Sequence, residues 1–254
     1  QTVFVSSGAA EPVLLTDTLA GMAPGFSDVE IIHLSDVRED APLRSPELAS
    51  SFHQNHFYHG RGVSEVTIDG ESDFTPMNVA QLPGAIAKGT VPIDVALIQV
   101  SPPDSYGLCS LGVSVDACRA AIKHASLVIA QVNDRMPETM GDSLIPVDNI
   151  HYLVEHNAEL CEVPPVDLDP VSLTIGRHVA SLISDGMTLH VDGGPIGAAT
   201  LRYLDLNKDL GIHTDVLTDD ILRLIRSGAI TNRKKQSNKG KTVATMAIGS
   251  KELY

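Results

Sequence analysis

A strongly apolar run from Val95 to Val100 is followed at once by the segment Ser101-Pro-Pro-Asp104. A run of this length predicts a strand that is buried on both faces, as in a parallel sheet covered by helices. Proline lacks a backbone N–H and cannot continue a central strand, so the chain must turn after Val100. In open α/β sheets ligands bind outside the carboxyl ends of the strands, and this turn is therefore a candidate site.

Strand-like segments alternate with helix-like segments along most of the chain. Strands are predicted at residues 2–6, 29–34, 93–100, 127–132, 188–191, 211–213 and 242–248. This alternation is typical of βαβ units. It predicts an α/β fold with an open, mostly parallel sheet covered by helices.

The clearest helix pattern covers residues 170–184. Asp169 is the predicted N-cap, Pro170 suits the first helical position, and Gly186 follows the last turn. One face of this helix is apolar and carries Val171, Ile175, Val179, Leu182 and Ile183. We predict that this face packs in the protein core. A second helix is predicted to begin at Thr218 and to end before Gly228.

The chain length of 254 residues suits one large α/β domain or two small ones. Residues 137–170 are rich in Pro, Asp and Asn, which predicts a long connection near residues 160–169. We therefore predict an amino-terminal domain over residues 1–254 that can be subdivided into 1–165 and 166–254. Because Gln1 is not an initiator methionine and a predicted strand starts at Thr2, we expect a fragment of a larger protein.

The formal net charge of −14 disfavours nucleic acid and anionic membranes as partners. One short basic cluster consists of Arg233, Lys234, Lys235, Lys239 and Lys241. It is either a solvated loop or a local attraction for an anionic ligand. The three cysteines form no even disulfide framework, and no apolar run approaches the length of a membrane span. These features predict a cytoplasmic protein.

A glycine-rich turn follows the predicted strand at 188–191, in the segment His190-Val-Asp-Gly-Gly-Pro-Ile-Gly-Ala-Ala199. Glycines in such a turn let backbone N–H groups approach a phosphate or an oxyanion at the start of the next helix. A turn of this kind serves structure as often as function. Its position after a buried strand favours function here.

His53, His56 and His59 recur every three residues and resemble a set of metal ligands. The spacing fits one helical face only loosely, and Gly60 interrupts the segment. We predict that these histidines are structural and that the chain holds no metal.

Three other residues of reactive types are assigned structural roles. No pattern places a histidine beside Cys109, so we predict that this cysteine is a small buried residue and not a nucleophile. Asp116 and Asp134 are predicted to be N-caps or turn residues.

Six segments taken together resemble one family. They are Glu11-Pro-Val-Leu-Leu15, residues 94–104, Gly107-Leu-Cys-Ser-Leu-Gly-Val-Ser114, Met136-Pro-Glu-Thr-Met-Gly-Asp-Ser143, Leu210-Gly-Ile-His-Thr214 and Gly228-Ala-Ile-Thr-Asn232. In this order they resemble the amino-terminal half of the acetyl-CoA hydrolase/transferase family, which includes 4-hydroxybutyrate and butyrate:acetate CoA-transferases. The resemblance covers nearly the whole chain.

The resemblance implies a CoA-transferase with two open α/β domains and an active site in the cleft between them. It implies a glutamate carboxylate that attacks the acyl-CoA thioester, forms a mixed anhydride and then a glutamyl thioester, and passes CoA to an acceptor acid. In the family this glutamate lies in a segment of the type Asp-Leu-x-Gly-Gln-Val-x-x-Glu in the carboxy-terminal half. It is therefore expected beyond Tyr254, and no catalytic residue is expected in this chain.

The implied function is the amino-terminal domain of an acyl-CoA:carboxylate CoA-transferase of the acetyl-CoA type, inactive without its carboxy-terminal half. Coenzyme A and its acyl thioesters are implied as substrates and not as permanently bound cofactors. The implied partners are a small carboxylic acid, the carboxy-terminal half or a partner subunit, and further copies in a homo-oligomer. The alternatives are a non-catalytic acyl-CoA-binding or assembly subunit and an acetyl-CoA hydrolase that uses water as acceptor.

The glycine-rich turn departs from the family pattern Thr-Leu-Gln-x-Gly-Ile-Gly-x-Ile-Pro. His190 stands where the family glutamine would donate from its amide, and Asp192 stands where the first glycine would lie. A carboxylate at that place opposes an oxyanion. The residues expected to bind substrate are Gln99, Ser101, Gly107, His190, Gly193, Gly194, Ile196 and His213, the two histidines lining the cleft. The alternative for Gln99 and Ser101 is that they only cap a strand end.

Overall fold

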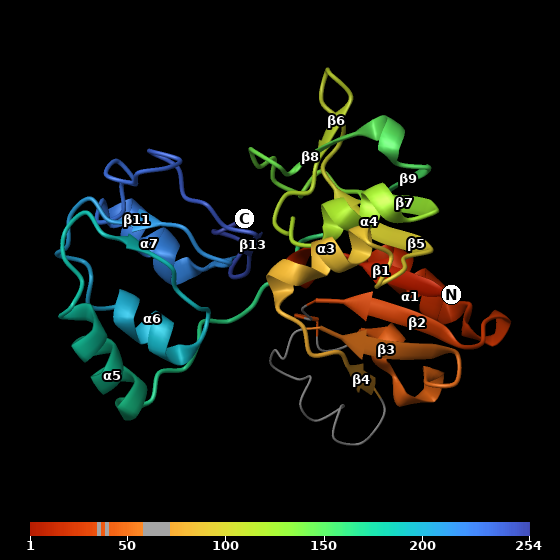
Figure 1. Cartoon of the computed structure of the whole chain (residues 1–254), viewed down its shortest axis with the longest axis horizontal. Helices are drawn as coiled ribbons and strands as arrows, with labels where there is room; N and C mark the ends of the chain where they lie inside the picture. The colour runs from red at the N-terminus through yellow and green to blue at the C-terminus, as the bar shows by residue number, and fades with distance from the viewer. Residues whose placement is uncertain (35–36, 39–40, 58–71) are drawn as a thin grey trace. The chain divides into compact units, whose positions relative to one another are not determined.

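The computed structural model describes residues 1–34, 37–38, 41–57 and 72–254 (Figure 1). The chain divides into two compact units, unit 1 (Gln1–Cys161) and unit 2 (Glu162–Tyr254). Each unit has hydrophobic core clusters of its own. The division into 1–165 and 166–254 remains a prediction of domain limits. In the described ranges, no helix has both the length and the apolar character needed to cross a membrane.

Unit 1 contains a seven-stranded sheet in which all neighbouring strands are parallel. The strands are β1 (Thr2–Val5), β2 (Val29–His33), β3 (Phe52–His56), β4 (Ser72–Phe74), β5 (Val95–Val100), β7 (Leu127–Val132) and β9 (Tyr152–Glu155). Their spatial order is β4-β3-β2-β1-β5-β7-β9, so the order reverses between β1 and β5. The predicted fold class, an α/β protein with an open and mostly parallel sheet, is confirmed.

The sheet of unit 1 separates two buried clusters, because successive side chains of a strand point to opposite faces. Phe4 packs in one cluster with Ile86 of α3 (Leu82–Ala87) and with residues of α4 (Cys118–His124). Val5 packs in the other cluster with Ala20 of α1 (Val13–Gly21). Short 3-10 helices lie at Gly8–Ala10, Ala23–Gly25, Pro42–Arg44, Pro46–Leu48, Val79–Gln81 and Val147–Asn149. An antiparallel pair, β6 (Leu108–Ser110) and β8 (Leu144–Pro146), follows the central strands.

Unit 2 is built from three helices and two short pairs of parallel strands. The helices are α5 (Pro170–Ala180), α6 (Pro195–Leu201) and α7 (Asp219–Ser227). One strand pair is β10 (Thr188–Leu189) with β11 (Gly211–Ile212), and the other is β12 (Val216–Leu217) with β13 (Met246–Ala247). Leu201, Leu210 and Leu224 lie at the centre of the unit 2 core.

The start of the first predicted helix and both ends of the second are confirmed. The Asp169 side chain accepts hydrogen bonds from the backbone N–H groups of Val171 and Ser172, at 2.8 and 3.0 Å, and so caps α5. Thr218 is the N-cap of α7, and Gly228 ends that helix with φ of 84°. Helix α5 ends at Ala180 and not at residue 184, because the chain turns through residues 181–183.

The prediction that the apolar stripe of α5 packs in the core is wrong for four of its five residues, which are exposed. They are Val171, Ile175, Val179 and Leu182. The buried side of α5 carries the small residues Ser172 and Gly176. A Cβ atom on Gly176 would lie 2.6 Å from the backbone carbonyl carbon of Ala199 in α6. Only glycine fits at this contact, so the side of α5 that carries the small residues faces α6.

His53 and His56 lie in strand β3 and not in a helix, and their side chains point to opposite faces of the sheet. The exposed His53 Nε2 lies 2.8 Å from Asp73 Oδ2, whereas the buried His56 ring stacks on His33 with centroids 4.9 Å apart. His59 lies outside the described residues. Within the described ranges, no group of three or more His, Cys, Asp or Glu side chains is arranged to hold a metal.

Candidate functional site

The sheet of unit 1 has its topological switch point between β1 and β5, where the strand order reverses. Ligands in open α/β sheets bind at such points, at the carboxyl ends of the strands. Here those ends lead into Ser6 and the 3-10 helix Gly8–Ala10 after β1, and into Ser101 after β5. The predicted site residues Gln99 and Ser101 therefore lie where the fold favours a site.

Gln99 is 3% exposed, and both the nitrogen and the oxygen of its side-chain amide are hydrogen-bonded inside unit 1. Its Nε2 donates to the backbone oxygen of Glu11 at 3.0 Å. Its Oε1 accepts from Asn133 Nδ2 at 2.7 Å and from Gln131 Nε2 at 3.2 Å. The amide joins the segment after β1 to the ends of β5 and β7.

Gln131 and Asn133 belong to the same network, although neither was a predicted site residue. Gln131 Oε1 accepts from the backbone N–H of Leu14 in α1 at 2.9 Å, and Asn133 Nδ2 also donates to the oxygen of Ala158 at 2.8 Å. Gln131 pairs directly with Gln99 in the register of β5 and β7. Two polar residues at matching places in two apolar strands were the sequence signal for this network.

Ser101 and Gly107 are also held by local hydrogen bonds. The Ser101 hydroxyl is buried, donates to the oxygen of Pro102 at 3.1 Å and accepts from the backbone N–H of Ser110 at 2.8 Å. Gly107 has φ of 73° and closes the turn after Asp104, a backbone conformation that favours glycine. These contacts give both residues a structural role, and binding of substrate by them remains a prediction.

The other predicted site residues lie in unit 2, near the carboxyl ends of β10 and β11. His190 follows β10, and His213 follows β11. The Thr214 hydroxyl donates to the oxygen of Val191 at 2.6 Å and accepts from its N–H at 3.1 Å, which holds the two chain segments side by side. The structure therefore brings His190 and the segment 213–215 together.

A carboxylate that was not predicted lies at this place. The Oδ2 atom of Asp215 is 3.4 Å from His190 Nε2, and the two side chains are 75% and 62% exposed. The backbone oxygen of Asp215 accepts hydrogen bonds from the N–H groups of Thr245 and Met246 at 3.1 and 3.0 Å. The residue therefore combines a fixed backbone with a solvent-accessible carboxylate. Asp215 directly follows Leu210-Gly-Ile-His-Thr214, one of the segments that carry the family resemblance, and this position could have marked it as a site residue.

The glycine-rich turn runs from Asp192 to the start of α6. Gly194 is the N-cap residue of α6, and a Cβ on Gly193 or on Gly194 would meet no atom within 4 Å. Gly197 is the glycine that packing requires, since a Cβ there would lie 2.2 Å from the oxygen of Asp192. The Asp192 side chain accepts a hydrogen bond from the Gly193 N–H at 2.8 Å. This backbone N–H of the turn is therefore already used inside the chain. Ile196 is partly exposed beside it.

The thiols of Cys109 and Cys118 in unit 1 are buried. Burial, and next the negative charge of Asp116, raise the pKa of the Cys118 thiol well above its usual value. Burial also raises the pKa of Asp116, against hydrogen bonds from Ser114 and the Cys118 segment. Burial, and then Asp104, raise the pKa of the Cys109 thiol. These thiols are poor nucleophiles, which agrees with the prediction for Cys109.

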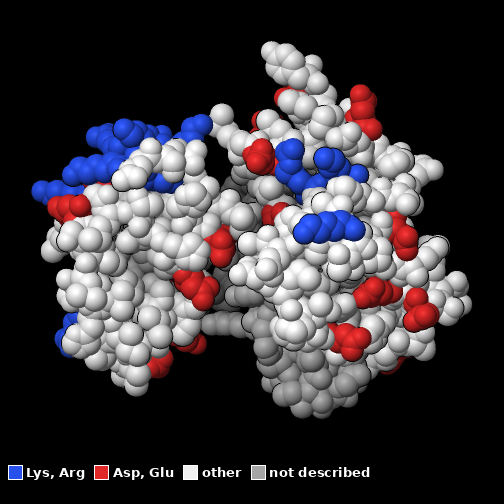
Figure 2. Space-filling view, viewed as in Figure 1, with Lys and Arg blue, Asp and Glu red and all other residues white. Residues whose placement is uncertain are grey.

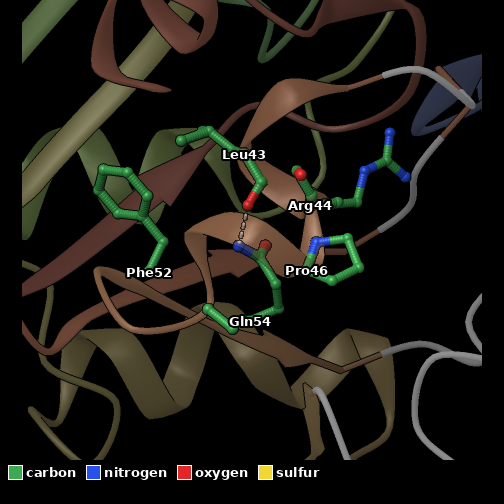
Figure 3. A pocket seen from close by; sticks show the side chains of 7 residues that line it. Leu43, Arg44, Pro46, Phe52 and Gln54 are labelled. Atoms are coloured by element: carbon green, nitrogen blue, oxygen red, sulfur yellow. Dashed lines mark hydrogen bonds between the residues drawn. The ribbon is translucent and has the colours of Figure 1, made fainter. Parts of the chain in front are cut away.

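A small hollow in unit 1 lies apart from these residues (Figure 3). Leu43, Arg44, Pro46, Phe52 and Gln54 line it, and Gln54 Nε2 donates to the oxygen of Leu43 at 2.8 Å. Its volume of about 10 Å³ suits one water molecule and not a substrate. None of the predicted substrate-binding residues lines it.

Comparison with known proteins agrees with the family resemblance. Residues 1–165 match the family model described as the acetyl-CoA hydrolase/transferase N-terminal domain. The chain is 38% identical to the 4-hydroxybutyrate coenzyme A transferase of Clostridium kluyveri over 257 residues, covering 99% of this chain and 58% of that protein. It is 34% identical to the succinyl-CoA:acetate/propanoyl-CoA:succinate CoA transferase of Fasciola hepatica, covering 99% of this chain and 53% of that protein.

A solved structure shows the same fold over the whole chain. The crystal structure of 4-hydroxybutyrate CoA-transferase from Porphyromonas gingivalis is 35% identical in sequence and aligns with a TM-score of 0.85. The alignment covers 100% of this chain and 60% of that one. The 254 residues thus span between about half and three-fifths of the length of these relatives.

Proposed function

The chain belongs to the acetyl-CoA hydrolase/transferase family, and we propose that it forms the amino-terminal part of an enzyme that transfers CoA from an acyl-CoA thioester to a small carboxylic acid. The relatives that bear CoA-transferase names match almost the whole of this chain, which supports the proposal. The chain covers only part of their length, so the activity is proposed for the complete protein.

The observation that carries the proposed chemistry is the exposed Asp215 carboxylate beside His190. The family resemblance implies a carboxylate nucleophile, and Asp215 carries a carboxylate close to His190, one of the predicted site residues of unit 2. We propose Asp215 as the candidate nucleophile. A glutamate outside these 254 residues, as the family resemblance implies, remains the alternative.

The proposed reaction proceeds in two exchanges at one carboxylate. An oxygen of Asp215 attacks the thioester carbonyl carbon, the C–S bond breaks, and CoA leaves as a thiolate, which gives a mixed anhydride. The thiolate then attacks the aspartyl carbonyl carbon, releases the donor acid and leaves Asp215 as a CoA thioester. The acceptor carboxylate takes CoA from it by the reverse of these steps.

His190 suits the role of a hydrogen-bond donor to the oxyanion that forms at each attack. The family glutamine at this place would donate from an amide, and an imidazole N–H donates in the same manner. Its Nε2 lies 3.4 Å from the Asp215 carboxylate, so one N–H reaches the region where the attack takes place.

The test is isotope exchange with the natural polypeptide that contains residues 1–254. We expect labelled acetate to exchange into acetyl-CoA, and mass spectrometry to find a CoA adduct on the peptide that carries Asp215. Asp215→Asn should lower the exchange rate by about a thousandfold or more, as loss of a nucleophile does. The matched control Asp167→Asn, which removes an exposed carboxylate elsewhere in unit 2, should leave the rate unchanged. An adduct on a glutamate outside these residues, with exchange intact in Asp215→Asn, contradicts the assignment of Asp215.

A non-catalytic acyl-CoA-binding or assembly subunit is the second candidate function. The Asp192 carboxylate occupies the Gly193 N–H, and this observation favours it because an oxyanion would otherwise use that donor. Calorimetry that shows CoA binding without any exchange would support this function. Release of free CoA from acetyl-CoA in the absence of an acceptor acid would identify the third candidate, an acetyl-CoA hydrolase.

We also propose that the complete enzyme is a cytoplasmic homo-oligomer that uses coenzyme A only as a substrate. Cys109 and Cys118 are buried free thiols, and this supports a reducing compartment. Chromatography with light scattering on the natural polypeptide tests the oligomeric state.

A further inference from the structure

Charge is distributed very unequally between the two units. Unit 1 has 7 Lys and Arg against 21 Asp and Glu, whereas unit 2 has 11 of each, so unit 1 accounts for the whole net charge of −14. Five of the eleven basic residues of unit 2 lie in the nine residues from Arg233 to Lys241, which we call the basic loop. Figure 2 shows Lys and Arg side chains gathered over this part of unit 2, at the upper left.

Most of these charges have no acidic partner. Arg233, Lys239 and Lys241 are exposed, and within the described residues no carboxylate lies within 4.0 Å of their charged groups. Lys234 Nζ is 3.6 Å from Asp209 Oδ2. The basic loop therefore has an excess of positive charge whose mutual repulsion favours binding of an anion.

The basic loop is held in one conformation by two buried side chains. Asn232 accepts at its Oδ1 from the Ile212 N–H at 2.9 Å, and its backbone oxygen accepts from the Gly240 N–H at 2.9 Å. Lys235 is 2% exposed, and its Nζ donates to the oxygens of Ile212 and Lys241 at 2.6 and 2.8 Å. Because both ends of the loop are fixed, little conformational entropy is lost when a ligand binds.

The basic loop is joined directly to the candidate site of unit 2. Lys241 is followed two residues later by Val243, which forms a parallel bridge with His213. The Val243 oxygen accepts from the Thr214 N–H at 2.9 Å, and Thr214 precedes Asp215. The basic loop and the Asp215 carboxylate thus belong to one connected part of unit 2.

We propose that the basic loop binds the phosphate groups of the nucleotide end of a CoA thioester. This inference rests on the proposed function, which requires an acyl-CoA close to Asp215. The nucleotide end of CoA carries several phosphate charges on a small molecule, and the exposed cations of one loop match a small polyanion. A long nucleic acid is disfavoured because the chain as a whole carries a net charge of −14.

The test compares ligands that differ in their phosphates. Calorimetry on the natural polypeptide uses CoA, 3′-dephospho-CoA and pantetheine with a variant in which Arg233, Lys239 and Lys241 are each changed to Gln. We expect CoA affinity to fall by about tenfold or more, as the sum of several exposed charge pairs, and pantetheine affinity to stay unchanged. The loss for 3′-dephospho-CoA should be smaller.

The matched control removes three exposed cations elsewhere through Lys88→Gln, Lys123→Gln and Arg177→Gln. CoA affinity should be unchanged in this control. Equal losses in both triple variants would overturn the inference, because they would show an effect of net charge alone. Circular dichroism checks the fold, and Lys239→Glu alone, which leaves the base of the loop intact, repeats the measurement if the triple variant unfolds.

The outcomes also separate this inference from the proposed function. CoA exchange that persists with unchanged CoA affinity in the loop variant overturns the inference and leaves the function standing. CoA binding that depends on the loop, without CoA exchange, overturns the proposed transferase function and leaves the inference about the basic loop standing. Absence of CoA binding by the unaltered protein overturns both, and loop-dependent binding of a single-stranded oligonucleotide in preference to CoA overturns the inference.

Discussion

Lys235 is a buried ammonium group whose Nζ donates to two backbone oxygens and to no carboxylate within the described residues. Burial lowers its pKa from the usual 10.5. Between that lowered pKa and 10.5 the unfolded chain binds more protons than the folded protein at this site. Its contribution to stability therefore increases as pH rises through this window and is smallest below the lowered pKa.

The corresponding prediction concerns Lys235→Met, which keeps an unbranched side chain one atom shorter and removes the titrating group. At neutral pH we expect the free energy of unfolding to fall by about 1–3 kcal/mol, because two carbonyl oxygens lose their buried donor. Urea unfolding from pH 8 to 10.5 measures the pH dependence, which should be weaker in the variant. A variant with an unchanged pH dependence would show that Lys235 does not titrate in this range.

Gln99 gives a second prediction at the scale of the residue. Gln99→Leu keeps the volume but removes the partner of Gln131 Nε2 and of the Glu11 oxygen. We expect the free energy of unfolding to fall by about 1–3 kcal/mol, since buried polar groups lose their hydrogen bonds. Urea titration of the purified chain measures the change. The exposed Gln81 offers the control Gln81→Leu, which should change stability little.

Some single residues of the two candidate sites could be predicted from the sequence, and others could not. Gln99 was identified as an expected site residue at the end of a predicted buried strand. Its partners Gln131 and Asn133 were missed because the register of β5 and β7, which brings them together, is a property of the sheet. Asp215 was missed for a similar reason, since its neighbour His190 is 25 residues earlier in the chain.

At the scale of the element, the contact of α5 with α6 depends on the absence of a side chain at Gly176. A Cβ there would lie 2.6 Å from the backbone carbon of Ala199, and backbone cannot move aside as a flexible side chain does. Gly176→Ala should therefore lower the free energy of unfolding by about 1–3 kcal/mol through overpacking. The higher helix propensity of alanine should offset about 1 kcal/mol of this loss. Thermal unfolding should show a net loss of stability.

The matched control for this substitution is Gly21→Ala at the end of α1, where a Cβ would meet no atom within 4 Å. There the gain in helix propensity is unopposed, and stability should rise by up to about 1 kcal/mol. Equal effects of the two substitutions would contradict the packing argument.

Elements with a regular pattern were predicted best. Strand β7 has the predicted bounds 127–132, because its apolar run has no competing interpretation. Strands β3 and β4 were missed, since the sequences Phe-His-Gln-Asn-His and Ser-Asp-Phe are polar and lie near the edge of the sheet. For α5 the N-cap was right and the buried face was wrong, because periodicity shows that a helix is amphipathic and not which neighbour it meets.

At the scale of the whole molecule, the alternation of strands and helices was enough to predict the α/β class, whereas the family resemblance came from the six sequence segments. The division into two units follows from the packing of the hydrophobic clusters. Both clusters of unit 1 consist of residues from 1–161, and the cluster of unit 2 consists of residues from 162–254. The units also differ in the size of their sheets, seven strands in one and two-stranded pairs with two residues per strand in the other.

This difference leads to a prediction about independent folding. Residues 1–161, prepared alone, should unfold cooperatively, because they keep the central sheet and both buried clusters that cover it. Residues 162–254 alone should be much less stable, since two-stranded pairs need further strands or helices for stability. Thermal unfolding followed by circular dichroism measures both. Residues 1–126 serve as the control, because they lack β7 and leave β5 without a partner on one side. If residues 1–161 unfold as gradually as residues 1–126, unit 1 is not an independent folding unit, and its sheet requires the rest of the chain.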